Sequence, residues 1–230
     1  MKVGVVVFPG SNCEQDVVHA IKLLGGEAHY VWHGDASFKA DALVLPGGFA
    51  YGDYLRTGAI AANSPIMDAV RDFASSGGPV LGICNGFQIL CESGILPGAL
   101  RRNAGLRFRC TDVYVKVETA DSPFTSSASA GEVLSIPINH FEGNYYCSKE
   151  TMLSLQGDDR VALRYCSPVG ELDPRYNPNG ALDAIAGVLS KERNVLGMMP
   201  HPERATDPAV GGTDGRVILA SMLSSVLASR

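Results

Sequence analysis

The most informative segment of this chain is Pro79-Val80-Leu81-Gly82-Ile83-Cys84-Asn85-Gly86-Phe87, which indicates a strand, a sharp turn and a helix in succession. Its apolar beginning predicts a buried strand over Val80–Ile83, and the residues from Phe87 to Glu92 predict a helix directly after it. Cys84 stands between two glycines at the turn, where a side chain on either neighbour would crowd the backbone. This is the cysteine form of a nucleophile elbow, a strained turn that presents a reactive group at the top of a sheet.

A simpler interpretation is that Cys84 is a buried cysteine that acts as a small apolar residue. The strand before it and the helix after it favour a nucleophile instead. The sulfur would lie at a helix N-terminus, where free amides and the helix dipole stabilise a thiolate. The leading hypothesis is therefore a cysteine hydrolase or transferase, which needs a base close to Cys84.

The first 95 residues alternate strand and helix patterns. Such alternation predicts a doubly wound, mostly parallel sheet with helices on both faces and with sites at the carboxyl ends of its strands. Pro46-Gly47-Gly48 and Cys84 both fall at such ends. The expected strands are Val3–Phe8, Glu27–Trp32, Asp41–Leu45 and Val80–Ile83, and the expected helices are Glu14–Leu24, Pro65–Ser75 and Phe87–Glu92.

The second half contains strand patterns with little helix between them, which predicts an antiparallel extension packed on the parallel core. Residues 1–230 are expected to form a single α/β domain, closed by a C-terminal helix from Gly215 to Ala228. The expected strands of the extension are Asp112–Glu118, Glu132–Pro137, Val161–Tyr165, Ala184–Leu189 and Asn194–Met199.

Composition narrows the class of protein. The 230 residues are 46% hydrophobic and 19% charged, which suits a large core, and the net charge of −5 gives no case for nucleic acid as a partner. The apolar N-terminal stretch is too short for a signal peptide, and no segment approaches membrane-spanning length. Six scattered cysteines without a CxxC pair argue against a metal site and fit a reducing compartment, so we expect a cytoplasmic protein.

His201 is the best candidate for the base among five histidines. It lies in Met199-Pro200-His201-Pro202-Glu203, directly after a predicted strand. Residues before proline favour extended backbone, and in an extended segment Glu203 projects to the same side as His201. A carboxylate there would orient the imidazole and stabilise its protonated form. The alternative is a proline-rich surface turn with a solvated glutamate.

An acyl-transfer site also needs an oxyanion hole. The backbone amide of Asn85, next after the nucleophile, and that of Gly48, in a neighbouring strand-end loop, are the expected donors. The chain contains no phosphate-binding loop, no dinucleotide fingerprint, no His-Glu-x-x-His and no carboxylate cluster for magnesium. We therefore expect this chain to bind neither ATP nor a metal for its chemistry.

Together these residues resemble a known family. Gly82-Ile83-Cys84-Asn85-Gly86-Phe87-Gln88 and Pro200-His201-Pro202-Glu203 are similar to two signatures of the class I, or triad, glutamine amidotransferases. Phe87 departs from the small residue or cysteine that is common there. Further segments, such as Phe8–Cys13, Leu45–Arg56 and Asn177–Gly180, resemble the glutaminase subunits of de novo purine synthesis.

The resemblance implies a flavodoxin-like sheet and a Cys84–His201–Glu203 triad that hydrolyses L-glutamine through a γ-glutamyl thioester. It implies that Gln88 shapes the glutamine pocket. It also implies two partners, namely a large ATP-dependent synthetase subunit, which uses ATP and Mg²⁺ and aminates formylglycinamide ribonucleotide, and a small bridging subunit. No cofactor is expected in this chain.

Two assignments and two other functions stay open. His140, in Ile136–Gly143, resembles a residue near the glutamine pocket, yet a structural histidine fits equally. Four arginines form the basic cluster, which is either a solvated face or a partner-docking surface. A stand-alone γ-glutamyl hydrolase and a catalytically silent regulatory subunit are the alternative functions. The members of the cluster are Arg101, Arg102, Arg107 and Arg109.

Overall fold

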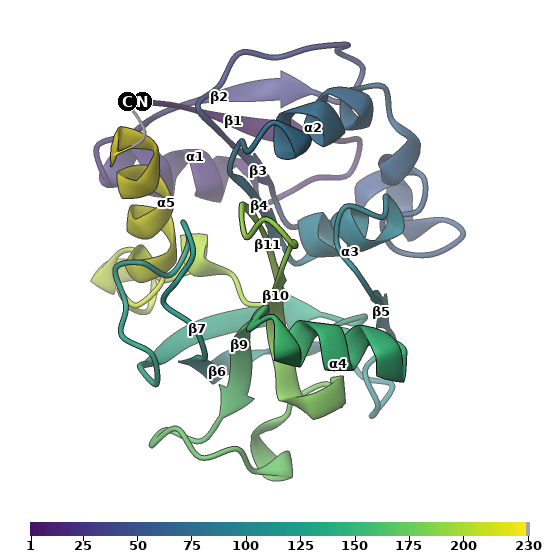
Figure 1. The fold of residues 1–230 in the computed structure, drawn as a ribbon. Helices are drawn as coiled ribbons and strands as arrows, with labels where there is room; N and C mark the ends of the chain where they lie inside the picture. Colours follow the sequence, from purple (N-terminus) through teal and green to yellow (C-terminus); the bar gives the residue numbers. More distant parts are fainter. Residues whose placement is uncertain (229–230) are drawn as a thin grey trace.

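A nine-stranded sheet runs through the computed structural model, which describes residues 1–228 (Figure 1). The strand order is β2-β1-β3-β4-β11-β10-β9-β6-β7, and β5 and β8 form a separate antiparallel pair. The strands are β1 Lys2–Val7, β2 Glu27–Trp32, β3 Ala42–Leu45, β4 Val80–Ile83, β5 Ala99–Arg101, β6 Arg109–Val117, β7 Val133–His140, β8 Asn144–Tyr146, β9 Val161–Cys166, β10 Ile185–Leu189 and β11 Val195–Met198. The α-helices are α1 Glu14–Leu23, α2 Ile66–Ser75, α3 Asn85–Glu92, α4 Lys149–Gly157 and α5 Arg216–Ala228.

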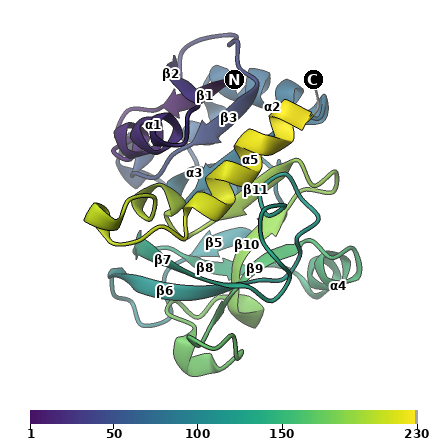
Figure 2. The same cartoon turned by 90° about the vertical axis from the view of Figure 1, so that its left-hand side faces the viewer.

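The parallel half contains β2, β1, β3, β4 and β11. Every residue of β3 and β4 is buried, as expected of short apolar strands that are covered on both faces. Helices α1 and α5 cover one face, and α2 and α3 cover the other (Figures 1 and 2). The predicted doubly wound sheet is confirmed, and β4 begins and ends at the predicted residues.

The antiparallel half begins where β10 pairs with β11 and continues through β9, β6 and β7. The predicted extension is therefore confirmed. Two strands and one α-helix went unpredicted, namely the separate pair β5 and β8 and helix α4. Each of the two strands has three residues, which is too short for a period to appear, and within α4 the one buried residue is Leu155.

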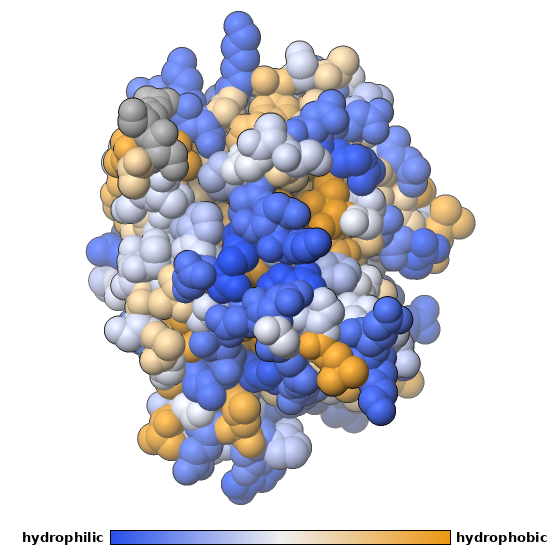
Figure 3. Space-filling model, in the orientation of Figure 1, coloured by the Kyte–Doolittle hydropathy of each residue, from blue (hydrophilic) through white to orange (hydrophobic). Residues whose placement is uncertain are grey.

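No helix among residues 1–228 is long and apolar enough to cross a membrane. The face of the molecule drawn in Figure 3 is mostly hydrophilic, and its hydrophobic side chains are scattered in small groups.

Candidate active site

Cys84 lies at the predicted elbow between β4 and α3, with φ 50° and ψ −102°. This left-handed backbone is strained for a residue with a side chain. Its two glycine neighbours are sterically required. A Cβ on Gly86 would overlap the Leu45 carbonyl oxygen, and one on Gly82 would overlap the Leu90 side chain. The strand, the turn and the helix therefore form the strained element that the sequence predicts.

His201 follows β11, the parallel neighbour of β4, so that its ring enters the same edge of the sheet. Its backbone N–H donates to the Pro137 carbonyl at 2.8 Å, and its Nδ1 lies 2.6 Å from Glu203 Oε1. Burial favours the neutral ring, but the Glu203 carboxylate and then Cys84 outweigh it and raise the pKa of His201 well above its usual value. The pair can therefore hold a proton inside the protein.

The prediction of extended backbone from Met199 to Glu203 is wrong in part. His201 has φ −101° and ψ 86°, as its place before proline requires, but Pro202–Arg204 form a 3-10 helix. The contact between His201 and Glu203 still forms, because one turn of 3-10 helix brings the carboxylate back to the ring. Both side chains are buried, with 1% and 0% of their surface exposed.

The second ring nitrogen of His201 is available for chemistry. Its Nε2 has no hydrogen-bond partner among residues 1–228, although it is buried. Cys84 lines the same pocket and interacts electrostatically with His201, while its sulfur lies 3.7 Å from the Asn139 carbonyl oxygen. Catalytic hydrogen bonds are often looser before substrate binds. The thiol and its proposed base are thus brought together from two adjacent strands.

Gly48 lies in the loop after β3, where it forms an antiparallel bridge with Ser11. The flanking hydrogen bonds run from Asn12 N–H to Gly47 O at 3.4 Å and from Phe49 N–H to Gly10 O at 3.2 Å. In such a bridge the N–H of the central residue points away from its partner. A Cβ on Gly48 would lie 2.8 Å from Ser11 Cα, so the close approach requires glycine.

Asn85 begins α3, whose first amides have no partner within the helix. Its side chain links the loop that carries Gly48 to α3. Asn85 Oδ1 accepts a hydrogen bond from Ala50 N–H at 3.0 Å, and its Nδ2 donates to Gln88 Oε1 at 2.9 Å. The loop that carries Gly48 is therefore fastened to the helix that follows Cys84.

A pocket of about 430 Å³ opens over these groups. Gln88 is fixed in its wall, because its Nε2 donates to the Glu142 carbonyl oxygen at 2.6 Å. The predicted residues Gly48, Cys84, Gln88, His140 and His201 all line the pocket. Further lining residues are Asn12, Cys13, Phe49, Asp53, Thr57, Arg102, Phe108, Asn139, Phe141 and Glu142.

Two carboxylates in this wall were not predicted as site residues. The pKa of Asp53 is raised to about 6 by burial and then by the charge of Glu142, and its Oδ1 has no partner among residues 1–228. Glu142 accepts a hydrogen bond from Thr57 Oγ1 at 2.8 Å and lies 3.6 Å from Arg102 Nε. The rule that sites lie at strand ends could have pointed to Asp53, in the loop after β3.

His140 ends β7 and is 3% exposed. Its Nδ1 lies 3.1 Å from Asn103 Oδ1, and a Cβ on Gly143 would overlap its ring. Burial, and next the charge of His201, lower the pKa of His140 to about 3, so that the ring is neutral. His140 is therefore both a packed residue and a part of the pocket wall.

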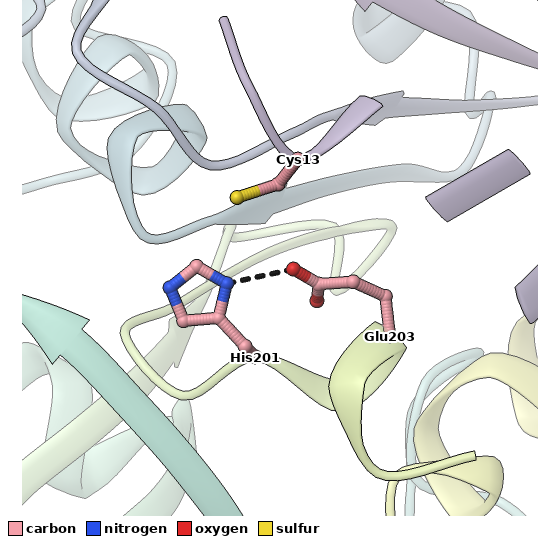
Figure 4. A group of neighbouring side chains, drawn as sticks. All are labelled: Cys13, His201 and Glu203. Carbon is pink, nitrogen blue, oxygen red and sulfur yellow. Dashed lines mark hydrogen bonds and ion pairs between the residues drawn. The ribbon is translucent and has the colours of Figure 1, made fainter. Parts of the chain in front are cut away.

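Cys13 is a second thiol at the site, and it was not predicted as a site residue. Its sulfur, a nitrogen of His201 and a carboxylate oxygen of Glu203 lie within 4.8 Å of one another (Figure 4). These are ligand types that zinc accepts, but the Arg204 guanidinium lies 3.1 Å from the sulfur and opposes a cation there. Its place in the loop between β1 and α1, which follows a strand end, was the available signal.

The four arginines of the basic cluster are all exposed. Arg101 lies 4.7 Å above the centre of the Tyr146 ring, and Arg102 reaches the pocket.

Several named proteins are similar to this chain over almost its whole length. Phosphoribosylformylglycinamidine synthase subunit PurQ of Moorella thermoacetica is 57% identical over 97% of this chain and 95% of the relative. The subunit of the same name from Rhodopseudomonas palustris is 56% identical over 97% of both chains. A chain in the structure of PurLQS from Thermotoga maritima superimposes with a TM-score of 0.87 at 42% identity, covering 98% of each chain.

A more distant structure supports the fold alone. The glutaminase domain of CTPS from Trypanosoma brucei, with bound acivicin, has a TM-score of 0.62 at 13% identity over 100% of this chain and 94% of that one. The model of the CobB/CobQ-like glutamine amidotransferase domain matches residues 1–211. With most of its length matched by that model, this chain belongs to the CobB/CobQ-like glutamine amidotransferase family.

Proposed function

We propose that this chain is the glutaminase subunit of a phosphoribosylformylglycinamidine synthase, and that it releases ammonia from L-glutamine with the Cys84–His201–Glu203 triad. The strained turn at Cys84, which opens into the same pocket as the buried His201–Glu203 pair, carries the proposal. The PurQ relatives and the family supply the reaction.

The first half-reaction forms a thioester. His201 Nε2 takes the thiol proton, and Cys84 sulfur attacks the side-chain amide carbon of glutamine. The carbonyl oxygen becomes an oxyanion, which accepts hydrogen bonds from the amides of Gly48 and Asn85. His201 then protonates the amide nitrogen, and the C–N bond breaks. Ammonia departs, and a γ-glutamyl thioester remains on Cys84.

The second half-reaction restores the thiol. Water attacks the thioester carbon while His201 takes its proton, and the C–S bond breaks as the oxyanion collapses. Glutamate leaves, and the sulfur regains a proton. Glu203 keeps the imidazole in one orientation throughout and stabilises its charged form.

The pocket wall suits an α-amino acid. Glutamine carries an ammonium and a carboxylate beyond its reacting amide. Asp53 and Glu142 offer negative charge for the ammonium. Burial and then the charge of Glu142 raise the pKa of Asp53, so an added cation beside these two carboxylates would be favourable. Arg102 offers positive charge for the carboxylate. Gln88 and His140 would shape the wall between these groups.

The chemistry of the product, ammonia, indicates that partner subunits are needed. In bulk water at neutral pH, ammonia becomes ammonium, which is not nucleophilic, so it must pass directly to an acceptor. We infer a large synthetase subunit that uses ATP and Mg²⁺ to aminate formylglycinamide ribonucleotide, and a small bridging subunit. The similar chain from Thermotoga maritima belongs to a structure of PurLQS, which supports an assembly of this kind. Six unpaired cysteines suit a reducing compartment, and we propose the cytoplasm.

Assay of the reconstituted complex tests this function. Cys84→Ala is expected to abolish glutamine-dependent amination and to leave amination with added ammonium unchanged, because the acceptor site is on another subunit. Cys110→Ala, on an exposed cysteine of β6, is the matched control and is expected to keep both activities.

Each other outcome supports a different function. Loss of the ammonium-dependent reaction in Cys84→Ala would argue against a separate acceptor site. Hydrolysis that needs no synthetase and does not rise with it would favour the stand-alone hydrolase. Glutamine hydrolysis that survives in Cys84→Ala would indicate the catalytically silent subunit.

A further inference from the structure

Cys13 brings a second sulfur to the catalytic pair from the opposite end of the chain. It follows β1 and precedes α1, and 1% of its surface is exposed. Figure 4 shows its side chain directed toward the edge of the His201 ring, while Glu203 reaches the ring from another side. The proposed reaction has a complete set of groups without Cys13.

Gly47 allows Cys13 and His201 to approach each other closely, because it has no side chain. A Cβ on Gly47 would lie 2.6 Å from His201 Cε1 and 3.0 Å from Cys13 Sγ, so both side chains pack against a residue that has none. The same segment fixes Cys13, because its backbone N–H donates to the Gly47 carbonyl at 3.3 Å. The Cys13 side chain and the His201 ring therefore both pack against the backbone of Gly47.

Hydrogen bonds fix the sulfur itself. Arg204 Nη2 donates to Cys13 Sγ at 3.1 Å, and the thiol donates to Asn12 Oδ1 at 3.1 Å. Arg204 Nε also donates to Asp16 Oδ2 in α1 at 3.2 Å. Arg204 belongs to the same 3-10 helix as Glu203. Cys13 and Asp16 therefore tie the segment that carries the carboxylate to the start of α1.

We propose that Cys13 is a positioning residue, whose sulfur packs against His201 and, through Arg204, holds the His201–Glu203 pair in the orientation that takes the proton from Cys84. This role rests on the proposed glutaminase function. A serine oxygen is smaller than sulfur and would not fill the space beside the ring. Cys13 is not a second nucleophile, because it has an ordinary backbone, with φ −103°, and lies outside the elbow.

The test measures Cys13→Ser and Cys13→Ala in the reconstituted complex. We expect kcat for glutamine hydrolysis to fall about 10- to 100-fold with KM nearly unchanged, because small misplacement of a catalytic group costs rate rather than binding. The limb of the pH profile that reports His201 should move to lower pH, because contact with Cys13 helps to raise the pKa of His201. Arg204→Met should act in the same direction, and Arg204→Lys should restore part of the rate.

A second readout needs no glutamine. Iodoacetamide alkylation of Cys84, followed by mass spectrometry of its peptide, reports the thiol and its base directly. It should slow in both Cys13 variants. Cys166→Ala removes an equally buried sulfur outside the pocket and is the matched control for every measurement. If Cys84→Ala still hydrolysed glutamine, the proposed glutaminase function would be wrong, whereas slower alkylation of Cys84 in the Cys13 variants would still support the positioning role.

Three results would overturn the positioning role. In the first, both Cys13 variants match the Cys166→Ala control in kcat, pH profile and Cys84 alkylation. In the second, KM rises alone, which would make Cys13 a part of the substrate wall. In the third, an active Cys84→Ala enzyme loses its activity when Cys13 is also replaced, which would make Cys13 a nucleophile.

Discussion

At the scale of single residues, Cys84 combines a strained backbone with a reactive side chain. A left-handed conformation at a residue other than glycine costs about 1–3 kcal/mol. Two hydrogen bonds hold it in place, from Cys84 N–H to Met198 O at 2.8 Å and from Gln88 N–H to Cys84 O at 3.1 Å. Neighbouring elements therefore maintain a turn that an isolated peptide would not adopt.

The two histidines of the pocket show how environment sets charge. Both are buried, and burial alone favours the neutral ring. His201 has a carboxylate 2.6 Å from Nδ1, and its pKa is raised. His140 has the neutral amide oxygen of Asn103 in that place, and its pKa falls to about 3. One ring is thus suited to carry a proton and the other is suited to stay neutral.

Acid should destabilise the protein through His140. Its folded-state pKa of about 3 lies below the unfolded value of 6.5, so its contribution is complete above pH 6.5 and is lost progressively as the pH falls toward 3. Between these limits the loss is at most about 1.4 kcal/mol per pH unit. Urea unfolding at pH 7.5, 6 and 5 should show the wild type losing stability faster than His140→Gln.

The matched control for that measurement is His29→Gln, on an exposed histidine of β2. It should follow the wild type at each pH. Parallel stability curves for the wild type and His140→Gln would contradict the assignment of a neutral, buried His140.

At the scale of elements, adjacent strand ends build the site. Parallel neighbours β1, β3, β4 and β11 end at the same edge of the sheet. That edge brings together the segments that follow them, which carry Cys13, Gly48, Cys84 and His201. Helix α3 packs against β3, β4 and β11, so the elbow is supported from beneath.

Gly86→Ala should break that support. The new methyl group would overlap the backbone carbonyl of Leu45, which cannot move aside as a side chain can, so we expect a loss of about 3 kcal/mol or more in unfolding free energy. Denaturant unfolding of the purified chain measures it. Gly157→Ala is the matched control in a helix, since nothing lies within 4 Å of its Cβ, and it should be neutral or stabilising by up to about 1 kcal/mol. Equal stability of the two variants would show that α3 can shift away from β3.

At the scale of the whole molecule, a single sheet changes from parallel to antiparallel between β11 and β10. The parallel half supplies the proposed nucleophile, its base and the expected oxyanion donors. The antiparallel half closes the pocket, because His140 ends β7 and Glu142 follows it. His201 joins the two halves directly, since its N–H donates to Pro137 in β7.

Arg193, in the turn between β10 and β11, joins distant loops of the chain. Its guanidinium donates to the carbonyls of Asp121, Asp158 and Asp159 at 2.6, 3.1 and 3.0 Å, and to Thr119 Oγ1 at 2.9 Å.

Arg193→Ala should therefore cost about 2–4 kcal/mol of unfolding free energy, and Arg193→Lys should recover little, because an ammonium cannot reproduce the planar fork. Arg175→Ala removes an exposed arginine paired within its own turn to Asp173, and it should leave the unfolding free energy nearly unchanged, because water screens an exposed ion pair. Thermal or urea unfolding measures both. If Arg193→Ala lost no more unfolding free energy than Arg175→Ala, Arg193 would not stabilise the contacts between these loops.

Much of the fold was predictable because its signals are local. Short apolar runs closed by glycine and proline set the strands of the parallel half, and Gly-x-Cys-x-Gly set the elbow. Helix α4 escaped prediction because Leu155, its one buried residue within Lys149–Gly157, leaves no apolar period to detect. The strands β5 and β8 depend on pairing with each other across some forty residues of chain.

The order of residues was enough to predict the proposed nucleophile, its base and the carboxylate that would orient the base, because each prediction rests on residue type and on the backbone of the nearest neighbours. The contacts of Cys13 and Arg204 with this triad, and the position of Asp53 and Glu142 in the same pocket wall, became visible in the folded molecule alone. Those contacts depend on which strands lie side by side and on how closely glycine lets two chains approach, and neither property can be read from the order of residues along one segment.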